Sequence, residues 1–242
     1  MNIRLLMTPI PLDKADVEEK TVVVIDVLSA TTSICAALVA GAKGVIATPG
    51  PGEAGDMRAK LGGDGVVLAG ERNCVRIENF HLGNSPSEFT AETVGGMHVI
   101  MTTTNGTLAL NRANKGKHVI TAGLVNMSRV VEAVAREKQD LLLVCSGREG
   151  HFSIEDTICG GMLIHRLTER FPDELQLNDA ASLALLLYRT NQDNFRESIA
   201  QGEHARFLAS IGFEKDIAIA TEVDSMPVLP VLRDGRLVNE VE

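Results

Sequence analysis

The sequence predicts an α/β protein that forms a single domain over residues 1–242, with a helical C-terminal part. The main observation is a pattern of apolar strand, polar turn and helix, which favours this fold class. The pattern occurs at residues 21–39, 98–110 and 141–167. Hydrophobic residues make up 45% of the chain and charged residues 23%, as is ordinary for a globular protein. Because the pattern repeats without a linker, the domain could consist of duplicated halves.

Apolar runs and turn residues place the elements of the first part. Residues 3–7 alternate weakly and predict an edge strand, whereas residues 21–26 open with a β-branched run typical of a strand buried on both faces. An Ala-rich helix follows as far as Val39 and ends before Gly41. The next predicted elements are a strand at 44–48, a helix at 54–61 and a strand at 66–69.

The same reasoning places the elements of the second part. Ser85 and Glu88 form a capping box that predicts a helix start. Gly160 and Gly161 fall inside a predicted helix, and since glycine weakens a helix, they indicate that another backbone packs close to it. The predicted strands are 98–101, 119–122, 141–145 and 228–232, and the predicted helices are 127–138, 153–167, 179–188 and 195–211.

The bulk composition excludes several classes of partner. The net charge of −9 argues against a nucleic-acid or anionic-membrane partner, because both require a basic surface. The four cysteines form no C-x-x-C pair, and we see neither a secretory segment nor an apolar run long enough to span a bilayer. We therefore expect a cytoplasmic protein whose reduced cysteines act as small apolar side chains. A homo-oligomer is compatible with these observations.

The first copy of the pattern has the features of a ligand site. Asp26 follows the apolar run, and the hydroxyls of Thr31 and Thr32 open the next helix. Open α/β sheets bind ligands at the carboxyl ends of their strands, and the N–H groups at a helix start suit an anion such as phosphate. Alternatively, Asp26 only caps the turn.

The other two copies repeat this arrangement. The third strand is followed by a glycine-rich turn and by Ser153, a candidate N-cap ahead of Asp156. The second strand runs into a polar turn whose hydroxyls and N–H groups could line an anion site; an ordinary Asn-Gly turn is the alternative. The residues of this turn are Thr103, Thr104, Asn105 and Gly106.

Carboxylates gather at these strand ends and helix starts. Oxygen ligands of this kind suit a hard cation such as Mg²⁺, which also offsets the repulsion between an acidic protein and an anionic ester. At least one carboxylate is expected to be only a structural cap. The candidates are Asp26, Glu71, Glu149, Glu155 and Asp156.

Two known kinds of phosphatase site do not fit the sequence. A cysteine phosphatase requires Cys and Arg six residues apart in one loop, whereas Arg148 lies only three residues after Cys145. A site of the haloacid-dehalogenase kind requires a second aspartate two residues after the first, and Leu28 stands at that place after Asp26. The histidines are scattered, and His151, in a candidate loop, fits a solvated histidine better than a proton shuttle.

Five motifs in this chain resemble those of the 2-phosphosulfolactate phosphatase family. They are D-V-L-S-A-T-T-S-I at 26–34, G-E-R at 70–72, G-N-S-P at 83–86, T-T-N-G-T at 103–107 and F-S-I-E-D-T-I-C-G-G at 152–161. Ser29 stands where the first motif of this family usually has arginine. The resemblance implies a three-layer α/β/α fold with a mixed, mostly parallel sheet.

The resemblance also implies a Mg²⁺-dependent phosphomonoesterase that hydrolyses 2-phosphosulfolactate to sulfolactate, a step towards coenzyme M. Asp26, Asp156 and Glu155 would bind the metal. Asp26, Glu71 and Asp156 would be catalytic, with Asp26 either the nucleophile or only a metal ligand. Arg72 would bind the carboxylate or sulfonate through paired hydrogen bonds. The other substrate-binding candidates are Thr31, Thr32, Asn84, Ser85, Thr103, Thr104, Asn105, Gly106 and Ser153. The alternative is a binding protein or sensor for a phosphorylated metabolite.

Overall fold

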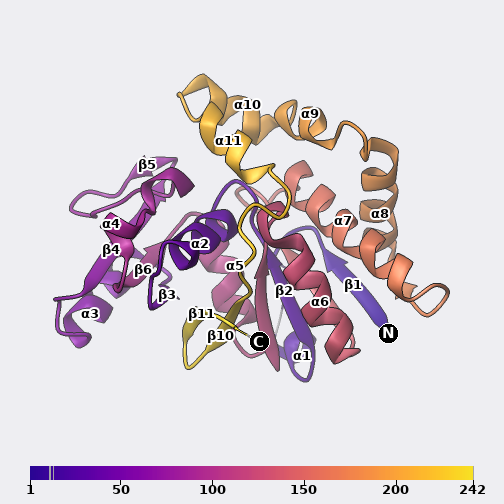
Figure 1. Cartoon of the computed structure of the whole chain (residues 1–242), viewed down its shortest axis with the longest axis horizontal. Helices are drawn as coiled ribbons and strands as arrows, with labels where there is room; N and C mark the ends of the chain where they lie inside the picture. Colours follow the sequence, from indigo (N-terminus) through magenta and orange to yellow (C-terminus); the bar gives the residue numbers. More distant parts are fainter. Residues whose placement is uncertain (11, 13, 242) are drawn as a thin grey trace.

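The computed structural model describes residues 1–10, 12 and 14–241, and it shows a mixed sheet with helices on both faces (Figure 1). This arrangement confirms the three-layer α/β fold predicted from the sequence. The strands are β1 (Asn2–Leu6), β2 (Thr21–Ile25), β3 (Gly44–Ala47), β4 (Val66–Arg72), β5 (Val75–Arg76), β6 (His98–Thr102), β7 (His118–Ala122), β8 (Leu141–Cys145), β9 (Gln176–Leu177), β10 (Pro230–Arg233) and β11 (Arg236–Asn239).

The helices largely follow the predicted pattern. Two of the short segments are 3₁₀ turns, η1 (Pro86–Glu88) and η2 (Leu124–Asn126). The α-helices are α1 (Lys14–Val17), α2 (Ala30–Val39), α3 (Pro51–Lys60), α4 (Ala91–Val94), α5 (Gly106–Ala113), α6 (Met127–Glu137), α7 (Ile154–Arg170), α8 (Asp179–Asn191), α9 (Phe195–Ala200), α10 (Glu203–Ser210) and α11 (Glu214–Ala220).

The sheet consists of two parallel groups of strands that a C-terminal hairpin joins. The strand order is β5-β4-β6-β3-β11-β10-β7-β2-β8-β1-β9. In the antiparallel hairpin, Val231 of β10 pairs with Ile120 of β7, and Leu237 of β11 pairs with Val45 of β3. The strand predicted at 228–232 is therefore present, and the segment after it forms the second strand of the hairpin, which the sequence did not predict.

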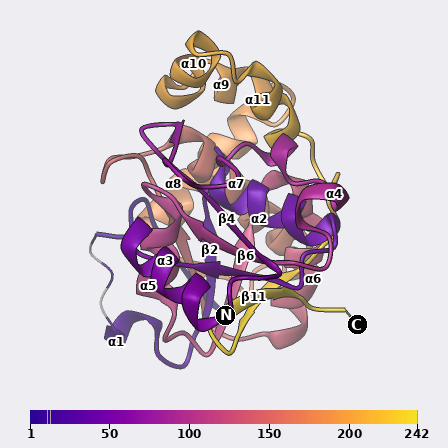
Figure 2. The same ribbon diagram turned by 90° about the vertical axis from the view of Figure 1, so that its left-hand side faces the viewer.

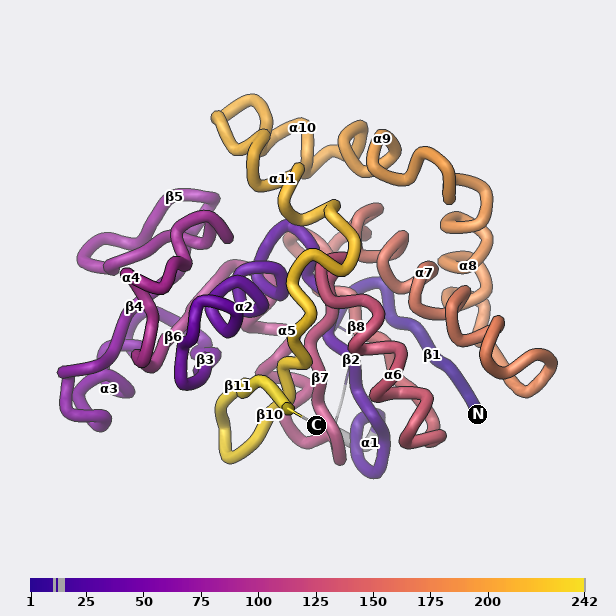
Figure 3. Tube along the Cα trace, viewed as in Figure 1, coloured from indigo at the N-terminus to yellow at the C-terminus, as the bar shows by residue number. Residues whose placement is uncertain are grey.

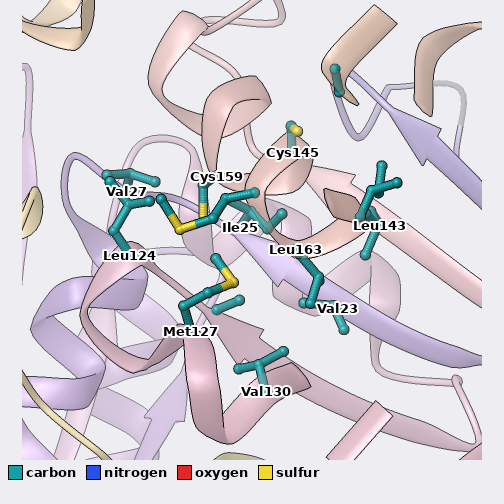
Figure 4. Close-up of a cluster of buried hydrophobic side chains, with 14 of the residues drawn as sticks. Val23, Ile25, Val27, Leu124, Met127, Val130, Leu143, Cys145, Cys159 and Leu163 are labelled. Carbon is teal, nitrogen blue, oxygen red and sulfur yellow. The ribbon is translucent and has the colours of Figure 1, made fainter. Parts of the chain in front are cut away.

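Alternation along the strands divides the core between the two faces of the sheet. Successive side chains of a strand point to opposite faces, so Val23 and Ile25 join the cluster formed with α6 and α7, where Met127 and Leu163 lie (Figure 4). Val24 belongs instead to the cluster formed with α2 and α5. α2 contacts strands of both parallel groups, so it helps to hold the two groups together.

The chain after α11 connects the helical end of the molecule to the hairpin (Figure 3). Asp224 N donates to Leu124 O at 3.0 Å, and Met226 N donates to Val125 O at 2.8 Å. Arg166 Nη1 of α7 forms an ion pair with Asp224 Oδ2 at 3.0 Å. These contacts fix the path along which the last strands reach the middle of the sheet.

Three element predictions need correction. β1 is not an edge strand, because it lies between β8 and the short β9. The helix predicted at 195–211 is interrupted at Gly202, where a Cβ atom would lie 2.7 Å from Ile154 Cγ2. The capping box is also wrong: Glu88 Oε2 accepts from Gly83 N, and Ser85 Oγ contacts Ser87 and Asp216 instead of capping η1.

The prediction of a close backbone contact is confirmed at Gly161, whereas the close neighbours of Gly160 are side chains of the sheet. A Cβ atom on Gly161 would overlap the carbonyl oxygen of Ala184 in α8, and one on Gly160 would lie 2.8 Å from Leu5 Cδ1. Glycine thus permits the close crossing of α7 and α8. In the described part of the chain, no helix combines the length and the apolar character needed to cross a bilayer.

Candidate active site

The main candidate site is a cavity of about 160 Å³ that residues far apart in the chain enclose. The segments that follow β2, β4, β6 and β8 each contribute to its wall, as open α/β sheets do at the carboxyl ends of their strands. α10 and α11 complete the wall, and these helices lie together at one end of the molecule (Figures 1 and 2). The cavity therefore joins the parallel sheet to the helical C-terminal part.

Asp26 directly follows β2 and lines this cavity, although its side chain is only slightly exposed. Its Oδ1 accepts a hydrogen bond from Ala30 N at 3.2 Å, so it also caps the first turn of α2. Burial raises the pKa of Asp26 to about 6, although the positive charge of His204 and hydrogen bonds from Ser146 and Ala30 act to lower it. Asp26 therefore caps the turn, as one of the two alternatives predicted, and it also lines the cavity.

Asp156 lies behind Asp26 and outside the wall of the cavity. Its Oδ1 accepts from Val27 N at 2.9 Å, and its Oδ2 accepts from Ser146 Oγ and Gly147 N at 3.1 Å each. Burial, and next the charge of Asp26, raise the pKa of Asp156 well above its usual range. Both oxygens of Asp156 accept hydrogen bonds from protein donors. Asp156 is therefore better suited to hold the loops after β2 and β8 in place than to bind a metal ion.

Glu71 lines the cavity and holds two of its segments together. Its Oε1 accepts from Thr104 N at 2.8 Å, and its Oε2 accepts from Cys74 N at 2.8 Å and from Thr104 Oγ1 at 3.1 Å. Thr103 also lines the cavity, but its Oγ1 accepts from Thr107 N at 3.2 Å. The Thr-rich turn is therefore in the site, with its hydroxyls engaged in protein hydrogen bonds.

Two helix N-termini reach the site. Ser29 and Asn105, the N-cap residues of α2 and α5, both line the cavity. A Cβ atom on Gly106 would lie 2.5 Å from Asp26 Oδ2 and overlap Ala30, so only glycine lets α5 start so close to Asp26. The positive ends of both helices therefore favour an anion at this place, although Ala30 N and Thr107 N already donate to Asp26 and Thr103.

Thr31 and Thr32 do not reach the cavity. Thr31 Oγ1 donates to the carbonyl oxygens of Asp26 at 2.6 Å and Ala122 at 2.8 Å, and Thr32 Oγ1 donates to Val27 O at 2.9 Å. Both side chains are fully buried. Because their hydroxyls stabilise the turn between β2 and α2, the predicted contact of these side chains with substrate does not fit the structure.

Arg72 does not line the cavity either. Its guanidinium donates to Glu71 O at 2.8 Å, to Thr102 Oγ1 at 3.0 Å and to Pro49 O at 3.4 Å. The side chain is absent from the described wall of the cavity. The predicted paired contact with a carboxylate or sulfonate is therefore not available to Arg72 in this arrangement.

Two of the remaining predicted residues line the cavity and one does not. Asn84 lines it, and its Oδ1 is buried without a hydrogen-bond partner among the described residues. Ser85 lines it and donates to Asp216 Oδ1 at 2.7 Å. Ser153 caps α7, with its Oγ accepting from Asp156 N at 3.3 Å, and it lines a neighbouring cavity instead.

His204 is the main residue of the site that sequence reasoning missed. It lines the cavity from α10, and its Nδ1 lies 3.1 Å from Glu155 Oε1. Burial alone would lower the pKa of His204, but hydrogen bonds to Cys74 and Glu155 and the charges of Glu155 and Asp26 raise it to about 10. His204 lies in none of the repeated strand ends, so no sequence pattern connects it to Asp26.

This pairing changes the role expected for Glu155. Glu155 is almost fully buried and forms an ion pair with His204, so it compensates a buried cation and does not face the cavity as a metal ligand. Arg76 and Arg148 are the other cationic side chains in the described cavity wall, and neither was predicted as a site residue.

A Mg²⁺ site needs oxygen ligands in a suitable arrangement. Among the described residues, no group of three or more His, Cys, Asp or Glu side chains could hold a metal ion. Mg²⁺ does not need such a group, since it commonly takes one or two carboxylates and completes its shell with waters and phosphate oxygens. Asp26 fits this requirement, because its carboxyl lines the cavity between two helix N-termini.

Carboxylates, two helix N-termini and cationic side chains surround one small cavity in this three-layer α/β protein, which is a suitable environment for a small anion. Comparisons with known proteins place the chain more closely. The model of the 2-phosphosulpholactate phosphatase family matches residues 6–235. The chain therefore belongs to this family, which confirms the resemblance seen in the motifs and places the protein among the phosphoric monoester hydrolases.

Curated relatives agree with this assignment. The chain is 37% identical over 220 residues to the probable 2-phosphosulfolactate phosphatase of Caldanaerobacter subterraneus subsp. tengcongensis, covering 91% of this chain and 90% of that protein. It is 39% identical to the protein of the same name from Thermotoga petrophila, and the match covers 90% of this chain and 92% of that protein. It is 33% identical to the protein of the same name from Clostridium acetobutylicum, and the match covers 98% of this chain and 100% of that protein.

Proposed function

We propose that this protein is a Mg²⁺-dependent phosphatase that hydrolyses 2-phosphosulfolactate to sulfolactate and phosphate. The observation that supports this most strongly is the position of Asp26, a cavity-lining carboxyl beside the N-termini of α2 and α5. A phosphoryl group can occupy such a place only if its charge is offset, and helix N-termini and a cation both do so. The names of the relatives point to the same substrate.

Asp26 is the residue that we expect to hold the metal, with waters and the substrate completing the shell. When bound, Mg²⁺ would offset negative charge and polarise the phosphoryl group. Asp156 would keep the loops after β2 and β8 in place through Val27 and Gly147. His204, protonated at neutral pH because its pKa is about 10, adds positive charge next to Asp26.

The positive ends of α2 and α5 would offset the negative charge of the phosphoryl oxygens. Glu71 holds the turn at Thr104 that leads into α5, so its contribution is to keep that turn in position. Hydrolysis breaks the ester P–O bond, and water supplies the hydroxyl for phosphate and the hydrogen for the alcohol of sulfolactate. Such a product suits a step towards coenzyme M, and the free cysteines suit a cytoplasmic location.

The test is phosphate release from 2-phosphosulfolactate and from a panel of other phosphate esters, with Mg²⁺ and with excess chelator. We expect release to require the metal and to be fastest with 2-phosphosulfolactate. Full activity in chelator would contradict the metal requirement. Binding of the esters without any release would support instead the alternative of a sensor for a phosphorylated metabolite.

A further inference from the structure

We propose that Arg148 is a specificity-determining residue that binds the second acidic group of the substrate, a sulfonate or a carboxylate, while the phosphoryl group lies near Asp26. This inference rests on the proposed function and adds the part of the site that recognises the rest of the substrate. Its basis is the position of the Arg148 guanidinium between two adjoining cavities.

Arg148 lines the cavity that contains Asp26 and also a neighbouring cavity of about 370 Å³. Its Cζ lies 5.0 Å from the centre of the Phe207 ring, which lines the first cavity. Its Nη1 lies 3.5 Å from Glu203 Oε1, and Glu203 lines the second cavity. The guanidinium therefore lies where a substrate that extends from Asp26 towards the second cavity can contact it.

The loop that carries Arg148 is well fixed. Arg148 N donates to His151 O at 3.0 Å, and His151 N donates to Arg148 O at 2.8 Å. Gly147 adopts a φ of +61°, and a Cβ atom there would overlap His151 O, so the turn requires glycine. Glu149 N donates to Asn105 Oδ1 at 2.9 Å, which ties the loop to the start of α5.

The guanidinium has donors left for a ligand. The side chain of Arg148 is 24% exposed, while that of its acidic partner Glu203 is 87% exposed, and an ion pair with so exposed a group is weak. Contact with the Phe207 ring orients the guanidinium plane without using its N–H groups. A planar fork of N–H donors matches the paired oxygens of a carboxylate or sulfonate.

The other cations near the site are less suited to this role. Arg72 donates to Thr102 and to backbone carbonyls. His204 forms a buried ion pair with Glu155. Arg76 is exposed on β5 and contacts His81 O at 3.4 Å. Arg148 is thus the half-buried arginine in the described cavity wall whose acidic partner is almost fully in solvent.

The test compares the wild type with Arg148→Gln on three esters. These are 2-phosphosulfolactate, 2-phospholactate, which keeps the carboxylate, and isopropyl phosphate, which has neither acidic group. We expect KM for 2-phosphosulfolactate to rise at least tenfold, equivalent to about 1.4 kcal/mol, and KM for isopropyl phosphate to change less than twofold. If KM for 2-phospholactate also rises in Arg148→Gln, the carboxylate is the group that Arg148 binds. If KM for 2-phospholactate does not rise, the group is the sulfonate.

Binding of sulfolactate, measured by calorimetry, tests Arg148 without requiring hydrolysis. Its Kd should rise at least tenfold in Arg148→Gln. Arg206→Gln removes the same charge from an exposed position on α10 and should leave Kd unchanged. Glu203→Gln keeps Arg148 and removes the competing carboxylate, so it should lower Kd even if Arg148→Gln fails to fold.

Two outcomes would overturn the role of Arg148: an equal rise of KM for isopropyl phosphate, or a Kd for sulfolactate that neither Arg148→Gln nor Glu203→Gln changes. These differ from a failure of the proposed function. A wild-type protein that releases no phosphate, but whose sulfolactate binding weakens in Arg148→Gln, would refute the phosphatase and keep the acid-binding site.

Discussion

Asp26 lies close enough to Asp156 for its charge to raise the pKa of Asp156, yet their surroundings give the two residues different tasks. Asp26 faces the cavity, whereas the oxygens of Asp156 accept three hydrogen bonds from protein donors. The carboxylate that can bind a ligand is therefore the one with fewer protein partners. Substitution by asparagine, which keeps the shape of the side chain, should separate the two roles.

For Asp26→Asn we expect kcat/KM to fall by about three orders of magnitude, since a metal ion contributes several kcal/mol to transition-state stabilisation. The free energy of unfolding should stay the same or rise, because burial disfavours the ionised form of Asp26. Steady-state kinetics at saturating Mg²⁺ measure kcat/KM, and urea denaturation measures the free energy of unfolding. Near-normal kcat would show that Asp26 is only the cap of α2.

Asp156→Asn should instead lower the free energy of unfolding. The amide NH₂ would face N–H or O–H donors of Val27, Ser146 or Gly147, and an unsatisfied buried donor costs about 1–3 kcal/mol. Urea denaturation of the two variants side by side measures the difference. Equal stability of Asp156→Asn and wild type would contradict the positioning role.

His204 should make stability depend on pH. Its pKa rises from 6.5 to about 10 in the folded protein, so the folded state holds an extra proton between these values. Stability from this group is complete below pH 6.5 and is lost as pH rises through about 10. One pKa unit equals about 1.4 kcal/mol, so the decline should be at least of that size.

Denaturation midpoints of the wild type and of His204→Gln at several pH values measure this effect. The decline in stability above pH 6.5 should be smaller in the variant than in the wild type. His165→Gln is the matched control, since its acidic partner Glu169 is largely exposed, and it should keep the decline. The same slope in wild type and His204→Gln would show that His204 carries no extra proton.

Among the elements, α7 and α8 depend on a glycine contact for their close crossing. Gly161→Ala would force a methyl group against Ala184 O of α8. We expect a net loss of about 1–3 kcal/mol in the free energy of unfolding, despite the better helix propensity of alanine. Gly55→Ala in α3 is the control, because nothing lies within 4 Å of its Cβ position, and it should stabilise by about 1 kcal/mol.

Thermal denaturation of Gly161→Ala and Gly55→Ala measures the change in stability that each substitution causes. Stabilisation by Gly161→Ala as well would mean that α8 can move away at no cost. The control also separates the general effect of replacing a helical glycine from the effect of the contact with Ala184.

Elements with strong local patterns were predictable from the sequence. β2 shows this, because four β-branched residues in a row, Val22 to Ile25, allow little other than a buried strand. Asp26, Glu71 and Thr103 were found because ligand sites follow strand ends. His204 and Arg148 were not predicted as site residues. The local sequence does not show that the helix of His204 or the loop of Arg148 packs near the end of β2, which is distant in the chain. Arg72 was predicted to bind substrate but does not line the cavity, because its position next to Glu71 in the sequence does not determine which groups its side chain contacts.

At the scale of the whole molecule, the C-terminal hairpin holds the two parallel groups of strands together. Leu237 of β11 is almost fully buried and belongs to the core cluster of α2 and α5. Leu237→Ala should cost about 2–5 kcal/mol, the range for buried leucine. Because the hairpin contacts β3 and β7, the loss should appear as one cooperative transition, measured by fluorescence and circular dichroism. Two separate transitions would show that the groups of strands unfold independently.

The central position of this hairpin has a consequence for how the protein is made. β10 and β11 follow the other described strands in the chain, yet they lie in the middle of the sheet, between β7 and β3. Until residue 239 has emerged, both neighbouring strands lack a partner on that side, and open edges of this kind pair readily with other chains. The sheet can therefore be completed only after β11 has been synthesised, and a chain that lacks β10 and β11 should be prone to aggregate.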